Sequence, residues 1–192
     1  AQILFQDRGG IILGGEDEGE AGLTGVGSLP MWHQAYNAGV RIHSNSYGSD
    51  GDGAYSGGDI FADRSLRELE DLLILFAAGN DGSLGENTIG SPGNAKNVVT
   101  VGALGHGNSR FKASFSSQGP TDDGRLKPDV MATGTLIDSV SGDMDNGSTV
   151  LEPRRAQKSG TSMATPITAG SAALMRQYYT EGFYPTGIAN VI

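Results

Sequence analysis

Apolar and polar residues follow one another along this chain in blocks that predict alternating helices and strands. Residues 30–38 and 59–71 carry apolar side chains at helical spacing, with polar side chains between them, which is typical of amphipathic helices. Strands are predicted at residues 40–47, 72–78 and 98–103, and residues 72–78 form a nearly continuous apolar run, as expected where both faces of a parallel sheet are covered. Strand and helix in alternation predict an α/β fold with right-handed crossover connections.

The segments between these blocks are rich in glycine and polar residues, which predicts surface loops. A short apolar run at residues 3–5 predicts a further strand, and residues 161–179 predict a long helix that ends before Gly182. One or two short strands are expected within residues 130–140. Because no internal repeat or linker is found, we predict one domain over residues 1–192. Loops or irregular structure are expected at residues 6–29, 49–58, 104–126 and 141–157.

The composition narrows the class of protein. The 192 residues carry 13 basic and 22 acidic side chains, a formal charge of −9, which argues against nucleic acid or an anionic membrane as a partner. The chain has no cysteine, which excludes disulfides, a thiol nucleophile and thiolate metal ligands. No apolar run reaches the roughly 18 residues needed to span a bilayer, and no signal peptide is recognisable after Ala1.

One serine stands at the start of the last predicted helix. Residues 160–166 read Gly-Thr-Ser-Met-Ala-Thr-Pro, so Ser162 lies among small residues at a helix N-terminus. Free N–H groups and the positive end of the helix dipole favour a developing oxyanion there, which makes Ser162 a candidate nucleophile. The ordinary alternative is a helix cap, because serine and threonine commonly precede helices.

The full run of residues 160–166, with the Ala-Gly that follows it, resembles the nucleophile motif of the subtilisin-like serine proteases, the subtilases. Other segments resemble further parts of this family in the expected order. Across residues 36–178 the resemblance implies a three-layer α/β sandwich with a mostly parallel sheet, of which this chain would be the C-terminal part. The matching segments are 42–48 (Ile-His-Ser-Asn-Ser-Tyr-Gly), 76–82 (Phe-Ala-Ala-Gly-Asn-Asp-Gly), 91–103, 113–120 and 127–132.

The resemblance implies catalytic roles for two side chains. Ser162 would be the nucleophile that forms an acyl-enzyme. Asn80 would donate its side-chain amide to the oxyanion, with the backbone N–H of Ser162 as the second donor. The alternative for Asn80 is a turn residue, since Gly-Asn-Asp-Gly is favourable turn chemistry.

Two predicted strands end in residues that are candidates for substrate binding. Ligands of parallel sheets bind beyond the C-terminal strand ends, and the resemblance implies that this rim is the active-site cleft. There an extended peptide would pair as an added strand with Ser46, Tyr47 and Gly48. Ala77, Ala78 and Gly79 would wall the pocket for the side chain before the scissile bond, leaving room for a large apolar group, with Tyr47 covering one wall. The alternative is a plain strand end and turn.

The family's other two catalytic segments are not found in this chain. Subtilases order their triad Asp, His, Ser along the sequence, with the histidine in a His-Gly-Thr-His segment and the aspartate in an Asp-Thr/Ser-Gly segment. None of His33, His43 and His106 has that context, and we assign none of them as the general base. The resemblance therefore implies that the chain starts after the family's histidine segment, so that the N-terminal part of the fold is missing.

The sequence leaves three hypotheses on function open. The chain is part of a serine endopeptidase whose base and aspartate come from a preceding segment, and it is inactive without that segment. Alternatively, it is a non-catalytic module that binds peptide without turnover. A third hypothesis is that the isolated chain is not stably folded, because an uncovered sheet edge would pair with other copies. The sequence upstream of Ala1 discriminates between the first two.

The implied chemistry requires no cofactor. Acidic loops at residues 16–20 and 50–59 offer carboxylates that suit calcium, although solvated loops are the simpler explanation, and subtilases often bind structural calcium. The resemblance also implies a polypeptide substrate, the chain's own preceding segment as a partner, and secretion.

Overall fold

The computed structural model describes residues 31–107, 109–141 and 154–186. Four parallel strands form its central sheet in the spatial order β1-β2-β3-β4. Their bounds are β1 (Ile42–Asn45), β2 (Leu73–Ala77), β3 (Val99–Leu104) and β4 (Val130–Thr133). The predicted strands at residues 40–47, 72–78 and 98–103 are therefore confirmed, with ends that differ by one or two residues.

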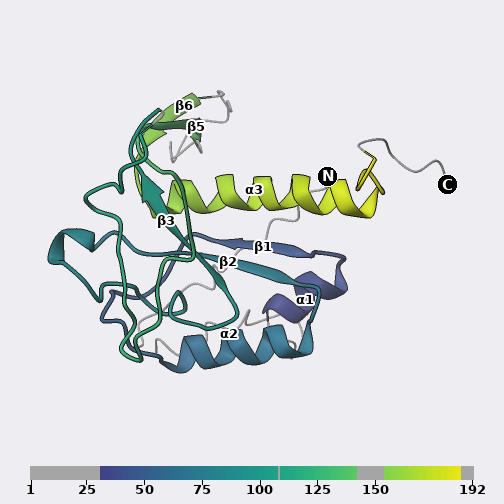
Figure 1. Cartoon of the computed structure of the whole chain (residues 1–192), viewed down its shortest axis with the longest axis horizontal. Helices are drawn as coiled ribbons and strands as arrows, with labels where there is room; N and C mark the ends of the chain where they lie inside the picture. The colour runs from purple at the N-terminus through teal and green to yellow at the C-terminus, as the bar shows by residue number, and fades with distance from the viewer. Residues whose placement is uncertain (1–30, 108, 142–153, 187–192) are drawn as a thin grey trace, which may run out of the picture.

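Helices cover both faces of the sheet, as Figure 1 shows. α1 (Met31–Asn37) and α2 (Gly57–Glu68) lie on one face, and the long α3 (Thr161–Thr180) packs across all four strands on the other. The three predicted helices are confirmed, and the arrangement is the expected three-layer α/β fold. Residues 3–5 and 6–29, for which a strand and a loop are predicted, lie outside the described residues.

Strand β2 contributes alternate side chains to two separate hydrophobic cores. Ile74 and Phe76, both fully buried, face α1 and α2 and pack with Trp32 of α1. Leu75 faces the opposite way and packs in the core beneath α3 with Ala164. This alternation explains the continuous apolar run in the sequence, because a strand covered on both faces needs apolar side chains at every position.

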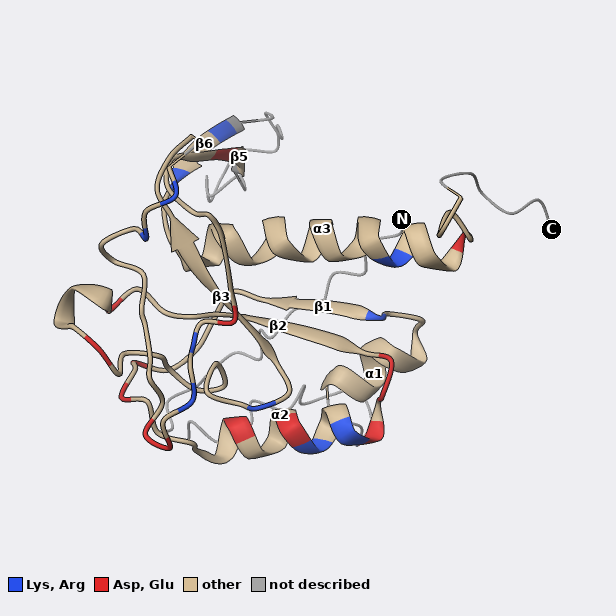
Figure 2. Ribbon diagram, in the orientation of Figure 1, with Lys and Arg blue, Asp and Glu red and all other residues tan. Residues whose placement is uncertain are grey.

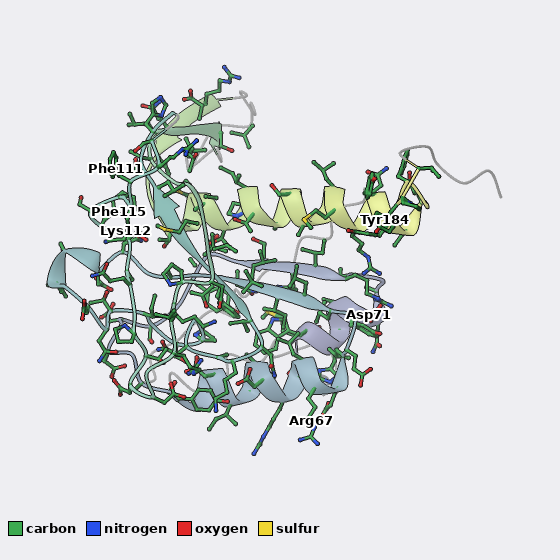
Figure 3. All side chains as sticks on the ribbon, viewed as in Figure 1. Arg67, Asp71, Phe111, Lys112, Phe115 and Tyr184 are labelled. Atoms are coloured by element: carbon green, nitrogen blue, oxygen red, sulfur yellow. The ribbon has the colours of Figure 1, made fainter. Side chains whose placement is uncertain are left out.

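The two helical layers differ sharply in charge, as Figure 2 shows. α2 is amphipathic and begins with a capping box, in which the Asp59 carboxylate accepts hydrogen bonds from the backbone N–H (2.9 Å) and Oγ (3.1 Å) of Ser56. Its outward face carries charged residues such as Arg67, which points away from the sheet in Figure 3. α3 contains one charged side chain in 20 residues, Arg176.

α3 nevertheless buries few of its side chains within the described part of the chain. Thr161, Ala164 and Thr165 are its buried residues. Large apolar side chains of a helix normally face the interior of a protein, so their exposure on α3 is unusual. No helix among the described residues is long and apolar enough to cross a membrane. The exposed apolar side chains of α3 are Ile167, Leu174, Met175, Tyr178 and Tyr179.

A second, smaller sheet departs from the sequence-based expectation. β5 (Ile137–Ser141) and β6 (Arg154–Lys158) pair antiparallel, whereas residues 141–157 were expected to be irregular. β6 has the sequence Arg-Arg-Ala-Gln-Lys, which carries no apolar alternation, so its pairing with β5 and not its own pattern makes it a strand. A short 3-10 helix, η1 (Gly82–Leu84), follows β2.

Candidate active site

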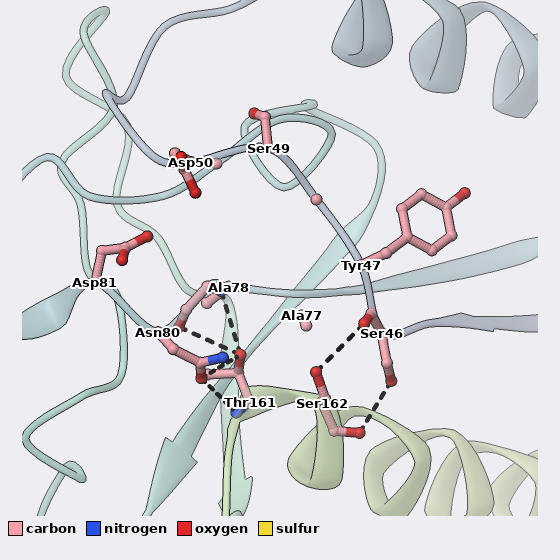
Figure 4. A pocket seen from close by; sticks show the side chains of 13 residues that line it. Ser46, Tyr47, Ser49, Asp50, Ala77, Ala78, Asn80, Asp81, Thr161 and Ser162 are labelled. Atoms are coloured by element: carbon pink, nitrogen blue, oxygen red, sulfur yellow. Dashed lines mark hydrogen bonds between the residues drawn. The ribbon is translucent and has the colours of Figure 1, made fainter. Parts of the chain in front are cut away.

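A pocket of about 280 Å³ opens between the C-terminal ends of β1 and β2 and the first turn of α3. Every residue proposed for the site from the sequence lines this pocket (Figure 4). Because the strands are parallel, their C-terminal ends meet at one edge of the sheet, and α3 brings its N-terminus to the same edge. These eight residues are Ser46, Tyr47, Gly48, Ala77, Ala78, Gly79, Asn80 and Ser162.

Ser162 lies in the first turn of α3 and is half-buried. Its Oγ donates a hydrogen bond to the backbone oxygen of Ser46 at 3.3 Å, and the Oγ of Ser46 donates to the backbone oxygen of Ser162 at 2.9 Å. The candidate nucleophile is therefore tied to the residue that follows β1, 116 positions earlier in the chain. In the first turn of α3 the N–H of Thr161 donates to Asn80 and that of Met163 donates to the backbone oxygen of Gly160, which leaves the N–H of Ser162 for an oxyanion.

The Asn80 side chain is held by the residue before Ser162. Its Oδ1 accepts hydrogen bonds from the backbone N–H of Thr161 at 3.0 Å and from Thr161 Oγ1 at 3.2 Å. Since a backbone N–H can only donate, its partner must be the amide oxygen, which fixes the orientation of the amide. The Nδ2 group consequently faces the pocket on the side of Ser162 (Figure 4).

Thr161 was not singled out from the sequence, and it is fully buried. Its hydroxyl accepts a hydrogen bond from the backbone N–H of Gly79 at 3.3 Å, and its single proton is shared between the backbone oxygen of Gly79 and Oδ1 of Asn80, each at 3.2 Å. It therefore joins the start of α3 to the end of β2. The signal that could have found it is its place directly before Ser162 in the Gly-Thr-Ser run.

The walls formed by residues 77–79 consist of small side chains and backbone. Ala78 is fully buried, and Gly79 has a φ of +106° with Ser117 Oγ only 2.8 Å from where a Cβ would stand. Any larger residue at position 79 would be strained and would clash. Residues 77–79 therefore give this side of the pocket small walls, and their role in binding a substrate side chain stays a prediction.

The ring of Tyr47 does not cover the pocket as the sequence led us to expect. It packs edge-to-face on Phe76, with ring centroids 5.5 Å apart, in the core beneath α1 and α2. Figure 4 shows the ring directed away from Ser162 and Asn80. The physical reason is burial: the apolar ring gains more from the neighbouring core than from a solvated wall. Any contact of Tyr47 with a bound peptide would therefore be made by its backbone.

The pocket is also lined by two acidic residues for which the sequence predicted no contact with substrate. Asp81 directly follows Asn80, and Asp50 follows the segment that leaves β1. The adjacency of Asp81 to Asn80 is a signal that could have revealed it. Asp50 had been considered only as a calcium ligand.

The three histidines lie outside the pocket. His33 Nε2 contacts Glu68 at 2.9 Å, and His106 Nδ1 lies 3.2 Å from the backbone oxygen of Thr135. His43 lies in β1, and burial lowers its pKa below the usual value, a shift opposed by its hydrogen bond with Asn45. Among the described residues, no histidine lines the pocket, which agrees with leaving the general base unassigned.

The acidic loop at residues 50–59 does not form a metal-binding cluster. Asp52 accepts a hydrogen bond from the N–H of Ala54 at 3.0 Å, while Asp59 is fully buried within the capping box of α2. Over residues 31–107, 109–141 and 154–186, no group of three potential ligands converges. The acidic residues 16–20 lie outside these ranges, so calcium there stays a prediction.

A hydroxyl at a helix N-terminus and a fixed carboxamide donor lie in one pocket, an arrangement that suits acyl transfer. Such donors stabilise the negative charge of a tetrahedral intermediate when they are preorganised. On a parallel α/β sheet this combination is typical of serine hydrolases.

Comparison with known proteins specifies the family. Residues 13–192 match the subtilase family, Peptidase S8, and the chain belongs to it. Serine protease AprX of Bacillus subtilis (strain 168) is 43% identical over 116 residues, covering 55% of this chain and 26% of that protein. The serine protease/ABC transporter B family protein tagD of Dictyostelium discoideum is 29% identical over 242 residues, covering 82% of this chain and 13% of its own length.

Solved structures show the same fold. The prenylagaramide maturation protease PagA superimposes with a TM-score of 0.58 and 26% identity, covering 78% of this chain and 49% of that one. The chain thus spans about half of this structure and a smaller share of its curated relatives. The subtilisin-like fold and membership of a family of serine proteases are shown.

Proposed function

We propose that this chain forms the nucleophile-bearing part of a serine endopeptidase. Ser162 Oγ attacks the scissile carbonyl of a bound peptide, its proton passes to a base, and the carbonyl oxygen takes the negative charge. Asn80 Nδ2 and the Ser162 backbone N–H hold that oxygen. Collapse expels the amine with the proton, and water then releases the acyl group from Ser162.

The observation that carries this proposal is the shared pocket of Ser162 and Asn80. The two residues stand 82 positions apart, yet both line it, and Thr161 fixes the amide so that its donor faces Ser162. A helix cap or a turn residue needs no such convergence. Peptide would lie along residues 46–48 and pair there as an added strand.

The general base and its aspartate come, in this proposal, from polypeptide outside the described residues. Two features favour further chain at this place. β1 is the edge strand of the described sheet and pairs there with β2 alone. α3 exposes large apolar side chains, with Leu174 68% and Met175 62% exposed, where burial would be favourable. A preceding segment that covers both would reach the pocket beside Ser46.

Fluorophosphonate labelling of the intact protein that contains this chain tests the proposal. We expect stoichiometric covalent modification at Ser162, located by peptide mass mapping, together with hydrolysis of unfolded protein substrates. Ser162→Ala abolishes both, whereas Ser171→Ala, on the exposed side of the same helix, leaves both unchanged. Absence of labelling in the folded wild-type protein would contradict the proposal.

A second candidate is a peptide-binding module without turnover. The observation in its favour is that the Ser162 hydroxyl is hydrogen-bonded to the Ser46 carbonyl, an acceptor that cannot serve as a general base. Saturable peptide binding without labelling or hydrolysis would support this candidate over the endopeptidase.

The proposed chemistry uses no cofactor, and secretion remains part of the proposal. Detection of the mature protein in the culture medium, with an intracellular marker retained in the cells, tests secretion.

A further inference from the structure

The end of the pocket away from Ser162 is acidic. Asp81 and Asp50 both line it, and Figure 4 places both carboxylates away from the Ser162 hydroxyl. None of the 13 lining residues is lysine, arginine or histidine. The lining therefore carries two negative charges that no cation among these residues balances.

Neither carboxylate is engaged elsewhere in the described part of the chain. No ion pair or side-chain hydrogen bond joins Asp50 or Asp81 to another residue of residues 31–107, 109–141 and 154–186. Asp81 is half-buried, and its backbone N–H donates to Ser117 Oγ at 3.0 Å, which fixes its position. Asp50 is exposed. Asp81 is thus the better placed of the two to attract a bound cation. Its charge is half-buried and is therefore screened less by water and salt than the exposed charge of Asp50.

The shape of the pocket suits one extended side chain. Its volume of about 280 Å³ is at the lower limit of the roughly 300–1,000 Å³ found for small-molecule pockets. The walls at Ala77, Ala78 and Gly79 are small, and the Tyr47 ring is withdrawn into the core. An aliphatic stem can lie along these walls while a polar head reaches the acidic end.

We propose that this pocket selects a peptide side chain with a cationic head, lysine or arginine, at the residue before the scissile bond. Asp81 is the main specificity-determining residue and Asp50 the second. The inference rests on the proposed function, which identifies the pocket as the place of that side chain. It replaces the purely apolar preference expected from the small walls alone.

Binding of product-type peptides tests the preference without relying on turnover. Three tripeptides, identical except for a C-terminal lysine, norleucine or glutamate, are titrated calorimetrically into the intact protein carrying Ser162→Ala. Norleucine has the stem of lysine without the charge. At low ionic strength we expect the lysine peptide to bind about tenfold more tightly than the norleucine peptide, equivalent to ~1.4 kcal/mol, and the glutamate peptide to bind most weakly.

Variants separate the two carboxylates from the overall charge of the protein. Asp81→Asn reduces the lysine-to-norleucine ratio more than Asp50→Asn does, and the double variant brings the ratio to about one. The matched control is Glu70→Gln with Glu86→Gln, two exposed acidic residues outside the pocket, which removes the same charge and keeps the ratio. The ratio falls as salt is added, because screening weakens charge attraction.

Three results overturn the proposal: equal or tighter binding of the norleucine peptide, a ratio that survives the double substitution, or no binding of any of the three peptides. Failure of the proposed function has a different signature. Wild-type protein that shows the lysine preference but is neither labelled at Ser162 nor hydrolytic would refute the endopeptidase and keep the acidic pocket. Labelling of Ser162 without the preference for the lysine peptide would keep the endopeptidase and refute the acidic pocket.

Discussion

The backbone N–H of Thr161 donates a hydrogen bond of 3.0 Å to Oδ1 of Asn80. The start of α3 therefore orients the carboxamide at the end of β2 as well as presenting Ser162. This contact occupies the amide oxygen of Asn80, so the amide nitrogen, its side-chain donor, faces the pocket. The proposed nucleophile and the proposed oxyanion donor are thus coupled through the pair Thr161 and Asn80, and substitution of either partner should alter catalysis.

Replacing Asn80 with alanine removes the side-chain oxyanion donor. We expect kcat of the intact protease to fall about 10²–10³-fold, or roughly 2.7–4 kcal/mol, with a small change in KM; this magnitude is the measured cost of removing such a donor from a subtilisin. Steady-state kinetics on a peptide substrate measure it, with Asn87→Ala, outside the pocket, as the control. A kcat within threefold of wild type would remove Asn80 from the oxyanion site.

Replacing Thr161 with valine keeps the shape of the buried side chain and removes its hydroxyl. The bond from the Thr161 backbone N–H to Asn80 survives, but the hydroxyl's bonds with Gly79 and with Asn80 Oδ1 are lost. We expect a loss of about 1–3 kcal/mol in the free energy of unfolding, measured by urea titration. We also expect a fall of about 2- to 12-fold in kcat, since a single neutral hydrogen bond is worth about 0.5–1.5 kcal/mol.

Thr161→Ser is the matched control, because it retains the hydroxyl. Rescue of kcat by serine identifies the hydroxyl as a positioning group. If valine and serine are equally active, the hydroxyl has a structural role alone.

Replacing Phe76 with alanine empties the core that holds the Tyr47 ring. Phe76 is fully buried and also packs edge-to-face with Trp32 at 6.1 Å between centroids. We expect a loss of about 3–5 kcal/mol in the free energy of unfolding. Phe111→Ala is the control, since that ring is 83% exposed (Figure 3) and should cost less than about 0.5 kcal/mol. Equal losses for the two variants would contradict the described core.

Acidification should destabilise the protein through His43. Burial lowers the pKa of His43 in the folded state, so below the unfolded value of about 6.5 the unfolded chain binds the proton more strongly. The stability that neutral, buried His43 gives the folded state is fully present above about pH 6.5. It is lost as the pH falls from about 6.5 toward the pKa of His43 in the folded state. Unfolding midpoints measured between pH 8 and pH 5 should decline less steeply for His43→Gln than for wild type.

Titration of the Asp123 carboxylate falls outside the pH range of this experiment and does not affect the result. The hydrogen bond that Asp123 accepts from Arg125 is the main cause that lowers the pKa of this carboxylate to about 2. The stability linked to Asp123 is therefore present above about pH 4 and is lost only below it. Identical slopes for wild type and His43→Gln between pH 8 and pH 5 would show that His43 does not contribute.

Local sequence pattern was sufficient for the layers of the fold. The apolar runs at residues 72–78 and 98–103 and the helical spacing at residues 161–179 each lie close to the observed elements, because burial on one or both faces dictates the period of apolar residues. β6 could not be foreseen in this way. Its residues are mostly charged, and only its antiparallel partner β5 gives it strand geometry.

The sequence by itself identified the family of this protein, predicted the order of helices and strands around its central sheet, and pointed to Asn80 and Ser162 as candidate site residues. Only the tertiary structure decided that Thr161 turns the Asn80 amide, that the Tyr47 ring leaves the pocket, and that Asp50 and Asp81 share one lining. The reason is physical. Periodicity and motifs record what a residue needs from its near neighbours, whereas side-chain direction depends on groups that meet across the fold from distant positions.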